Sequence, residues 1–280
     1  MKTIPVIGTL ALSLAATAVI NAEVIAWDTF ETASAGALNG KGGGSGWTAN
    51  WTADSSTQIV SKSMSYSSGD ISLSGGDQAI LGGPASGSFS GSRTFSTTTE
   101  GVVYMSFLFE RIGDLTGDVL DFNLGDNPNN YRPSAGVDVR DVFNNSMYAA
   151  NGGGIIRGST GVSVTDSTAL VVARLTNGAD GYTTLDVLIN PSTTTEPASG
   201  WHNTTITLSD GETMMDSLNA FLIRNVNLDA GDGFYMDNLT IATSYTDVVS
   251  QIPEPSTYAL IGGVIALGIV MRNRRNQARK

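Results

Sequence analysis

Residues 101–111 of the chain read GVVYMSFLFER, the most regular stretch of its sequence. In an extended strand, successive side chains point to opposite faces, so residues two apart share a face. One face of this stretch carries Val103, Met105, Phe107 and Phe109, and the other carries Val102, Tyr104, Ser106, Leu108 and Glu110. The first face is wholly apolar, and the stretch therefore predicts a long β-strand whose apolar face lies in a hydrophobic core.

Two pairs of segments further along the chain have the same extended character. Residues 169–176 (ALVVARLT) and 182–191 (YTTLDVLINP) flank the sequence NGADG, and residues 218–228 (LNAFLIRNVNL) and 233–244 (GFYMDNLTIATS) flank DAGDG. Asn, Asp and Gly favour tight turns, so each pair is predicted to form a β-hairpin. For the first half of 212–223 (ETMMDSLNAFLI), a short helix is the alternative.

Weaker strand patterns occupy residues 23–31, 57–63, 88–96, 119–125 and 136–143. The chain also contains 33 glycines, which disfavour helices and punctuate strands. Short strands at roughly even spacing, separated by turns, predict an all-β fold, an antiparallel sandwich of two sheets. Because composition does not change between residues 23 and 245, we expect this range to form a single domain.

The central part of the chain is strongly acidic. The formal net charge of the whole sequence is −11, but 6 of its 15 basic residues lie near the termini: Lys2, Arg272, Arg274, Arg275, Arg279 and Lys280. Residues 23–252 keep 9 basic and 25 acidic side chains (all 26 except Glu254), a balance of −16. Such a surface repels nucleic acid, which is excluded as a partner. Because there is no cysteine, thiolate nucleophiles and cysteine-bound metal centres are excluded as well.

Both ends of the chain are typical of export. Residues 1–22 have a lysine followed by an apolar run and small residues, which predicts a secretory signal peptide with cleavage after Ala18 or Ala22. A polar linker over 246–257 leads to an apolar run over 258–271, which as a helix has a length of about 21 Å at 1.5 Å per residue. That is a short transmembrane segment, and the basic tail over 272–280 predicts a cytoplasmic C-terminus.

The C-terminal segment resembles a known sorting signal. Pro253, Glu254 and Pro255 are followed by the Gly-Gly-containing apolar run and then by an arginine cluster, Arg272, Arg274 and Arg275. This combination is similar to the PEP-CTERM signal, which covers about 25 residues here. The resemblance implies that an exosortase, a membrane enzyme, recognises the Pro-Glu-Pro triplet and that the arginines stop the chain in the inner membrane. It also implies delivery to the cell surface or extracellular space of a Gram-negative bacterium that makes extracellular polysaccharide.

The ends of the domain carry a second resemblance. The stretches WDTFE (27–31), LNGKGGGSGWTANW (38–51), YTTLDVLINP (182–191) and FYMDNLTIATSYTDVV (234–249) look like those of laminin-G-like, concanavalin-like jelly-roll modules. The resemblance implies a two-sheet jelly roll whose first and last strands pair. Members of this family bind carbohydrate or protein, or serve as accessory domains, so the resemblance alone does not decide the function.

The sequence has no convincing set of catalytic residues. His202 is the only histidine, and no G-x-S-x-G motif accompanies it, which argues against a serine triad. The E-x-D-x-x-E pattern of concanavalin-like glycosidases is also missing. We therefore expect a domain that is not an enzyme, with a secreted carbohydrate-active enzyme on a concanavalin-like fold as the alternative.

Binding residues are indicated only weakly. The turns DNPNN (126–130) and LDAGDG (228–233) contain oxygen ligands of the kind that Ca²⁺ prefers, but neither fits an EF-hand loop. Calcium binding stays open, no metal ligand is named, and no other cofactor is indicated. Trp47, Trp51 and Trp201 are the glycan-binding candidates, although packing in a core is the commoner fate of tryptophan. The sequence thus predicts a surface-sorted sandwich with a structural or glycan-binding role, and polysaccharide and exosortase as its partners.

Overall fold

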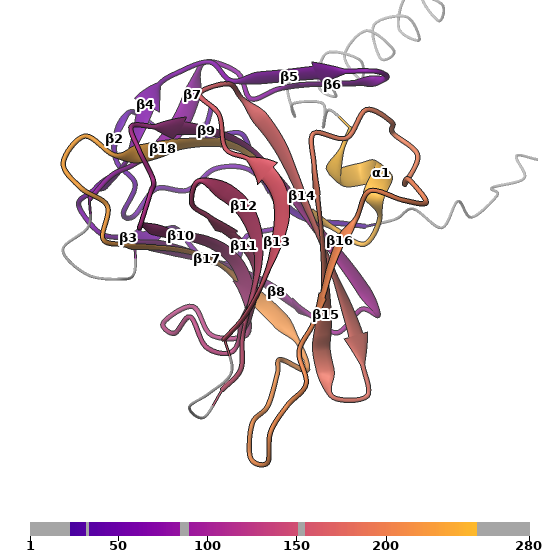
Figure 1. Ribbon diagram of the computed structural model, residues 1–280. Coiled ribbons are helices and arrows are strands. Elements are labelled where there is room, and N and C mark those ends of the chain that lie inside the picture. Colours follow the sequence, from indigo (N-terminus) through magenta and orange to yellow (C-terminus); the bar gives the residue numbers. More distant parts are fainter. Residues whose placement is uncertain (1–22, 32–33, 85–89, 151–154, 251–280) are drawn as a thin grey trace, which may run out of the picture.

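The computed structural model describes residues 23–31, 34–84, 90–150 and 155–250. These residues form two large antiparallel sheets packed face to face (Figure 1). The nine-stranded sheet has the order β16 (His202–Thr205), β15 (Gly181–Ile189), β14 (Ala169–Gly178), β9 (Val102–Ile112), β18 (Gly233–Ala242), β7 (Gln78–Gly82), β4 (Thr57–Ser61) and β2 (Gly36–Ala37), with β1 (Val24–Asp28) paired to β18. The predicted all-β, antiparallel two-sheet sandwich is therefore confirmed.

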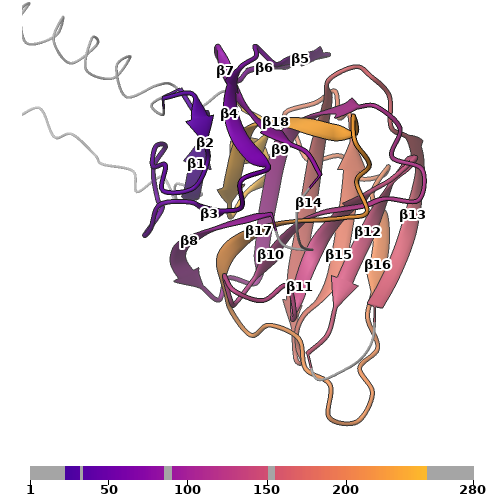
Figure 2. The same ribbon diagram turned by 90° about the vertical axis from the view of Figure 1, so that its left-hand side faces the viewer.

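The second sheet has seven strands. Its order is β13 (Ile155–Ser163), β12 (Val142–Tyr148), β11 (Ser134–Val139), β10 (Val119–Gly125), β17 (Leu218–Val226), β8 (Gly91–Thr98) and β3 (Thr52–Ala53). Figure 2 shows the same sandwich turned by 90°. The remaining elements are the hairpin of β5 (Ser65–Ser68) and β6 (Ile71–Ser74) and one short helix, α1 (Tyr245–Val248).

The main core lies between the two sheets. Val103, Met105, Phe107 and Phe109 of β9 all belong to it, as the alternation in 101–111 predicts. From the other sheet, the Phe122 ring packs against Phe107 at a centroid distance of 4.8 Å and against Phe234 at 5.2 Å. Each fully buried side chain of this size contributes about 1.5–3 kcal/mol of transfer free energy, so this layer holds the sheets together.

A second apolar layer covers the outer face of the nine-stranded sheet. The opposite face of β9 supplies Tyr104 and Leu108, and β14 supplies Leu170 and Val172. The β5–β6 hairpin and helix α1 pack onto these side chains from outside (Figure 1). Val249 is still buried in this layer, so the packed structure continues past residue 245.

One of the two predicted hairpins is present in the structure, and the other is not. β14 and β15 pair antiparallel from Gly178 and Gly181 outward, which confirms the first hairpin. The second prediction is wrong, because β17 pairs with β10 and β8 in one sheet, whereas β18 pairs with β9, β7 and β1 in the other. The segment DAGDG is a crossover between sheets. Its turn-forming residues are suited to a reversal of the chain, but they do not decide which sheet the next strand joins.

The pairing of the first and last strands is confirmed, since Val24 of β1 lies opposite Ala242 of β18. The alternative of a helix at the start of 212–223 is wrong, because the residues before β17 are turn and irregular structure. In the described parts of the chain, no helix is long and apolar enough to cross a membrane. The predicted signal peptide (1–22), the Pro253–Pro255 triplet, the predicted transmembrane segment (258–271) and the arginines of the tail all lie outside the described residues.

Candidate functional site

The outer face of the seven-stranded sheet differs from that of its partner, because it is polar. In β10, Leu120, Phe122 and Leu124 point into the core, so the alternating Asp121 and Asn123 point outward. The neighbouring strands continue this pattern. Across β17, β10, β11, β12 and β13, the register aligns two rows: Arg224, Asp121, Asp138, Asn144 and Ser159, then Leu222, Asn123, Gly136, Ser146 and Arg157.

Asp121 is the centre of a hydrogen-bond network on this face. Its Oδ2 accepts from the Tyr148 hydroxyl at 2.8 Å and from Arg224 Nη1 at 2.7 Å, and its Oδ1 accepts from Ser146 Oγ at 3.3 Å. The Asp121 carboxylate is fully buried beneath these groups. Burial raises its pKa, and the nearby Asp138 carboxylate raises it further.

Asp138 lies directly opposite Asp121 on the adjacent strand and is also fully buried. Its carboxylate accepts hydrogen bonds from Arg157 Nε at 2.6 Å and from Arg140 Nε at 3.2 Å. A buried carboxylate is tolerated only when it is paired and hydrogen-bonded. Each of the two aspartates therefore holds arginine side chains in place at the surface.

Two tyrosine rings stand among these arginines. The rings of Tyr131 and Tyr148 meet edge to face, with centroids 5.5 Å apart. The Arg224 guanidinium lies 4.5 Å from the Tyr131 centroid, and the Arg132 guanidinium lies 5.4 Å from Tyr131 and 5.7 Å from Tyr148. Arg157 Nη2 donates to the Tyr148 hydroxyl at 3.2 Å. We call Tyr131, Arg132, Tyr148, Arg157 and Arg224 the arginine–tyrosine face.

Two guanidinium nitrogens in this face lack partners. Nε of Arg132 and Nε of Arg224 are buried, and neither has a hydrogen-bond acceptor among the described residues. Arg132 also takes part in no salt bridge of the described chain; its contacts are the two tyrosine rings. An unsatisfied N–H of a charged group is costly to bury, so both guanidinium groups keep donor capacity that the described residues do not use.

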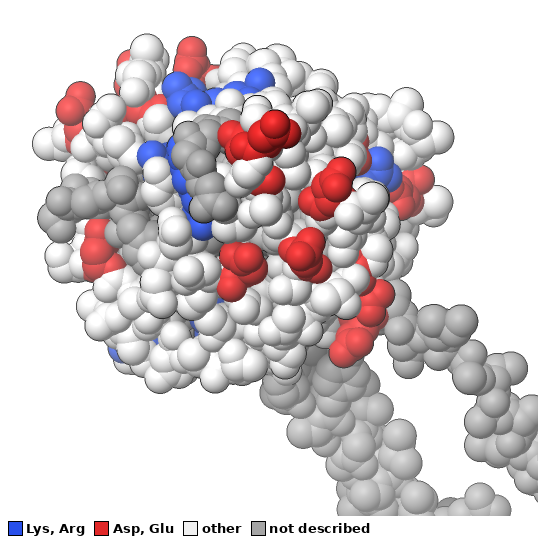
Figure 3. Space-filling view, turned by 90° about the horizontal axis from the view of Figure 1, so that it is seen from below, with Lys and Arg blue, Asp and Glu red and all other residues white. Residues whose placement is uncertain are grey.

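The local charge of this region opposes that of the domain. Arg132, Arg140, Arg157 and Arg224 carry four positive charges, whereas Asp121 and Asp138 carry at most two negative ones. Four of the nine basic residues of 23–252 thus gather in one place. Figure 3, which views the molecule from below, shows several basic side chains close together in its upper left part, others elsewhere, and acidic side chains scattered over the same face.

Tyr148 acts as a hydrogen-bond donor here. Burial raises the pKa of its hydroxyl, and the neighbouring Asp121 carboxylate raises it further. The phenol therefore stays protonated at neutral pH and donates to Asp121. Tyr148 itself is fully buried, so what the cluster offers a polar ligand is a set of fixed guanidinium donors beside the partly exposed Tyr131 ring.

The three tryptophans named by the sequence lie elsewhere. Trp51 is 2% exposed and packs edge-on against Phe221 in the core, so its ring is not available as a sugar platform. Trp47 is half-buried, donates from Nε1 to the Trp27 carbonyl oxygen and stacks with Arg93. Trp201 is half-buried beside Arg174. The ring centroids of Trp47 and Trp51 lie 6.2 Å apart. Trp201 lies apart from them, against the apolar layer on the outer face of the nine-stranded sheet.

The turns considered for calcium have internal partners. In 126–130, the Asn127 Oδ1 accepts from the Asn129 backbone, and near 228–233 the Asp232 Oδ1 accepts from the Asp114 backbone. Among the described residues, no group of three or more His, Cys, Asp or Glu side chains is placed to hold a metal ion.

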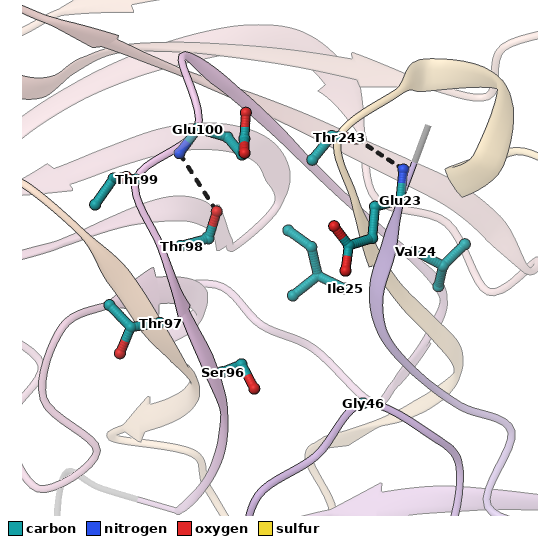
Figure 4. A pocket seen from close by; sticks show the side chains of 10 residues that line it. All are labelled: Glu23, Val24, Ile25, Gly46, Ser96, Thr97, Thr98, Thr99, Glu100 and Thr243. Carbon is teal, nitrogen blue, oxygen red and sulfur yellow. Dashed lines mark hydrogen bonds between the residues drawn. The ribbon is translucent and has the colours of Figure 1, made fainter. Parts of the chain in front are cut away.

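A hollow of about 430 Å³ lies between β1 and β8 (Figure 4). Ser96 and Thr98 of β8 point into it, while Thr97 and Thr99 point away, and Ile25 faces them from β1. The residues that line this hollow include no aromatic ring and no basic side chain. It therefore has fewer means of recognising a ligand than the arginine–tyrosine face.

Sequence reasoning missed the arginine–tyrosine face. Its signal was present in VLDFNLG (119–125) and in VFNNSMY (142–148), where polar residues occupy alternate positions of apolar strands. Polar alternation, however, is also what any solvent-facing strand shows. Only the register reveals that these positions meet on one face.

No protein-family model matches the chain, and no curated protein matches its sequence. Similar solved structures include an endo-β-1,4-glucuronan lyase from the fungus Trichoderma reesei, at 12% identity and a TM-score of 0.44, which covers 79% of this chain and 96% of the lyase. A glycosyl hydrolase family protein from Mycobacterium fortuitum matches at 11% identity and a TM-score of 0.46, over 78% and 99% of the two chains. The globular domain of T. cruzi calreticulin matches at 13% identity and a TM-score of 0.41, and the match covers 80% of this chain and 95% of that domain. Because these TM-scores lie below 0.5, the fold assignment rests on the strand order of the chain itself.

Proposed function

We propose that this chain is an exported surface protein whose jelly-roll sandwich binds a glycan through the arginine–tyrosine face, without catalysing a reaction. The observation that carries the proposal is the cluster of guanidinium groups and tyrosine rings on an outward sheet face, including two donors that no described residue satisfies. Planar donors beside the partly exposed Tyr131 ring suit the hydroxyl groups and apolar ring faces of sugars.

Glycan binding is tested with the full-length chain, purified in mild detergent and applied to arrays of bacterial and plant polysaccharides. We expect binding to at least one polysaccharide, with loss of binding in a variant that replaces Arg157 and Arg224 by glutamine. Arg111, which pairs with the exposed Asp166 outside this face, provides the matched control as Arg111→Gln. Equal binding by all three proteins, or absence of binding to every polysaccharide, would overturn the proposal.

Delivery to the surface belongs to the same proposal. We infer that Pro253, Glu254 and Pro255 are read by an exosortase, while the apolar run and Arg272, Arg274 and Arg275 hold the precursor in the inner membrane of a Gram-negative host. Replacing the triplet by alanines in a host that has an exosortase should leave the full-length protein in the inner-membrane fraction. Release of this variant at the normal rate would contradict the sorting role.

One observation favours a second candidate, a carbohydrate-active enzyme. Asp121 and Asp138 are cross-strand neighbours, and glycosidases use two carboxyl groups that lie about 5–9.5 Å apart. The raised pKa of Asp121 is the property expected of a general acid. Both carboxylates are nevertheless covered by arginines, so a substrate has no direct access to them.

The two candidates are separated by measuring the release of reducing ends or of unsaturated products from polysaccharides. We expect none from the wild-type chain. Release that disappears in both Asp121→Asn and Asp138→Asn, with the fold retained, would establish the enzyme and overturn the non-catalytic proposal.

A further inference from the structure

We infer that the ligand of the arginine–tyrosine face is an acidic polysaccharide, and that Arg132 pairs with the carboxylate of a uronate sugar. This inference rests on the proposed function, because it names the class of glycan that the same face selects. It is carried by the excess of positive charge in the region and by the state of one particular side chain.

The arginines of this region outnumber the carboxylates that they pair with. Arg224 is paired with Asp121, and Arg140 and Arg157 share Asp138. These three arginines carry three positive charges and their two carboxylate partners carry at most two negative ones, which leaves an excess of one positive charge. Arg132 raises this excess to two. A neutral glycan would leave this excess uncompensated, whereas a chain with one carboxylate per sugar supplies the missing negative charges.

Arg132 is the arginine of this face that has no carboxylate partner among the described residues. Its guanidinium is held between the Tyr131 and Tyr148 rings, has no acceptor among the described residues, and has a buried Nε. Other arginines of the domain that face carboxylates are hydrogen-bonded to them, as Arg93 is to Asp28 at 2.5 Å and Arg174 is to Asp186 at 2.8 Å. Arg132 therefore differs from them in lacking the partner that its geometry is suited to bind.

The planar shape of the guanidinium matches that of a carboxylate. A guanidinium presents its N–H groups in one plane, and a planar carboxylate accepts two of them side by side. Arg224, whose own Nε is also without an acceptor, stands over the same Tyr131 ring at 4.5 Å. The two orphan donors are thus gathered around one aromatic side chain, and the cluster fits a repeating anionic sugar better than a single isolated anion.

The negative charge of the rest of the domain restricts where an acidic polysaccharide can bind. Residues 23–252 carry a balance of −16, so an acidic polymer is repelled by most of the surface and attracted only where arginines gather. Binding should therefore weaken as salt is added, because the attraction is local and partly exposed to solvent. The side chains of Arg140 and Arg157 are 31% and 34% exposed, which leaves them accessible to a ligand.

The test compares three polymers on the full-length chain in mild detergent: polygalacturonate, the same polymer with its carboxyl groups methyl-esterified, and dextran sulfate. We expect binding to polygalacturonate only, and a decrease in affinity as NaCl is raised from about 50 to about 500 mM. Arg132→Gln should weaken binding by about tenfold or more, whereas Arg111→Gln should change it by less than about twofold. Arg132→Lys keeps the charge but not the planar fork, and should recover only part of the affinity.

Each outcome decides between the two levels of the proposal. Equal affinity for the esterified polymer would overturn the acidic ligand and leave glycan binding in place. Binding of dextran sulfate with the same dependence on Arg132 would overturn the carboxylate in favour of any polyanion. Unchanged affinity in Arg132→Gln would overturn the assignment of this residue, and absence of binding to every polysaccharide would overturn the proposed function as well. The polymer comparison and the salt series need only the wild-type chain, so they remain decisive if a variant misfolds.

Discussion

The outer faces of the two sheets have been used in opposite ways. On the nine-stranded sheet, Tyr104 and Leu108 of β9 and Leu170 and Val172 of β14 point outward, and a hairpin and helix α1 cover them with a second hydrophobic layer. On the seven-stranded sheet, the outward residues of β10, β11 and β12 are polar, and arginines and tyrosines gather over them. One face thus contributes to stability, and the other is the face that we propose binds the glycan. Mutations should separate the two roles.

The largest expected effect is on the apolar outer face. Leu108 is fully buried in the second layer, and Leu108→Ala should lower the free energy of unfolding by about 2–5 kcal/mol, because it leaves a cavity. Urea denaturation measures this change. Ile155 is 39% exposed at the edge of the other sheet, so Ile155→Ala is the control and should stay within about 0.5 kcal/mol of wild type. Equal losses in the two variants would contradict the role given to the second layer.

A pH effect is expected from Asp237, a fully buried aspartate of β18. Burial raises its pKa to about 9, so the folded chain keeps a proton that the unfolded chain loses above about pH 4. Its contribution to stability is therefore complete below pH 4 and is lost progressively as the pH rises toward 9. Asp237→Asn removes this dependence, and its stability relative to wild type should increase by about 2–4 kcal/mol between pH 5 and pH 8.

Unfolding curves of wild type and Asp237→Asn at the two pH values provide the measurement. If the free energy of unfolding changes with pH by the same amount in both proteins, Asp237 keeps no proton in the folded state.

A smaller effect is expected where the β5–β6 hairpin joins the nine-stranded sheet. A Cβ atom on Gly75 would lie 1.7 Å from Oδ2 of Asp237, so Gly75→Ala must displace a buried carboxyl group. We expect a loss of about 1–3 kcal/mol in thermal or urea unfolding. Gly101 has open space around the same position, and Gly101→Ala should have little effect. If the two variants are equally stable, the hairpin does not pack as described.

The smallest expected effect on stability is on the polar face. The Arg132 side chain has no hydrogen bond or salt bridge to lose within the described chain, so Arg132→Gln should change the free energy of unfolding by less than about 0.5 kcal/mol. The same variant is expected to lose most of its affinity for polygalacturonate. A large loss of stability would mean that Arg132 serves the fold, and the contrast between the two faces would then fail.

The sequence predicted the fold from its local patterns and failed where distant strands had to be matched. The alternation in 101–111 identified the core face of β9, and the turn at 177–181 identified the β14–β15 hairpin, but the second apolar layer on the other face of β9 was not predicted. The segment DAGDG was misjudged, because a turn does not reveal that β17 and β18 belong to different sheets.

The candidate site was hidden for the same reason. Asp121, Tyr148 and Arg224 are separated by 27 and 76 positions in the chain, and only the pairing of β10, β12 and β17 within one sheet brings their side chains together. The tryptophans drew attention instead because they are rare and aromatic, whereas packing against Phe221 is what Trp51 does. The type of a side chain is known from its position in the sequence, but which side chains form a site depends on how the strands pair.

The most direct test of the central claim is a two-dimensional NMR titration of the arginine Nε–Hε groups with oligogalacturonate. The account predicts that the resonances of Arg132 and Arg224, whose Nε atoms have no acceptor in the described chain, shift most and at the same ligand concentration. Arg93, buried in its salt bridge with Asp28, should stay unchanged. A titration in which the Arg132 and Arg224 resonances do not move while other arginines do would contradict the account.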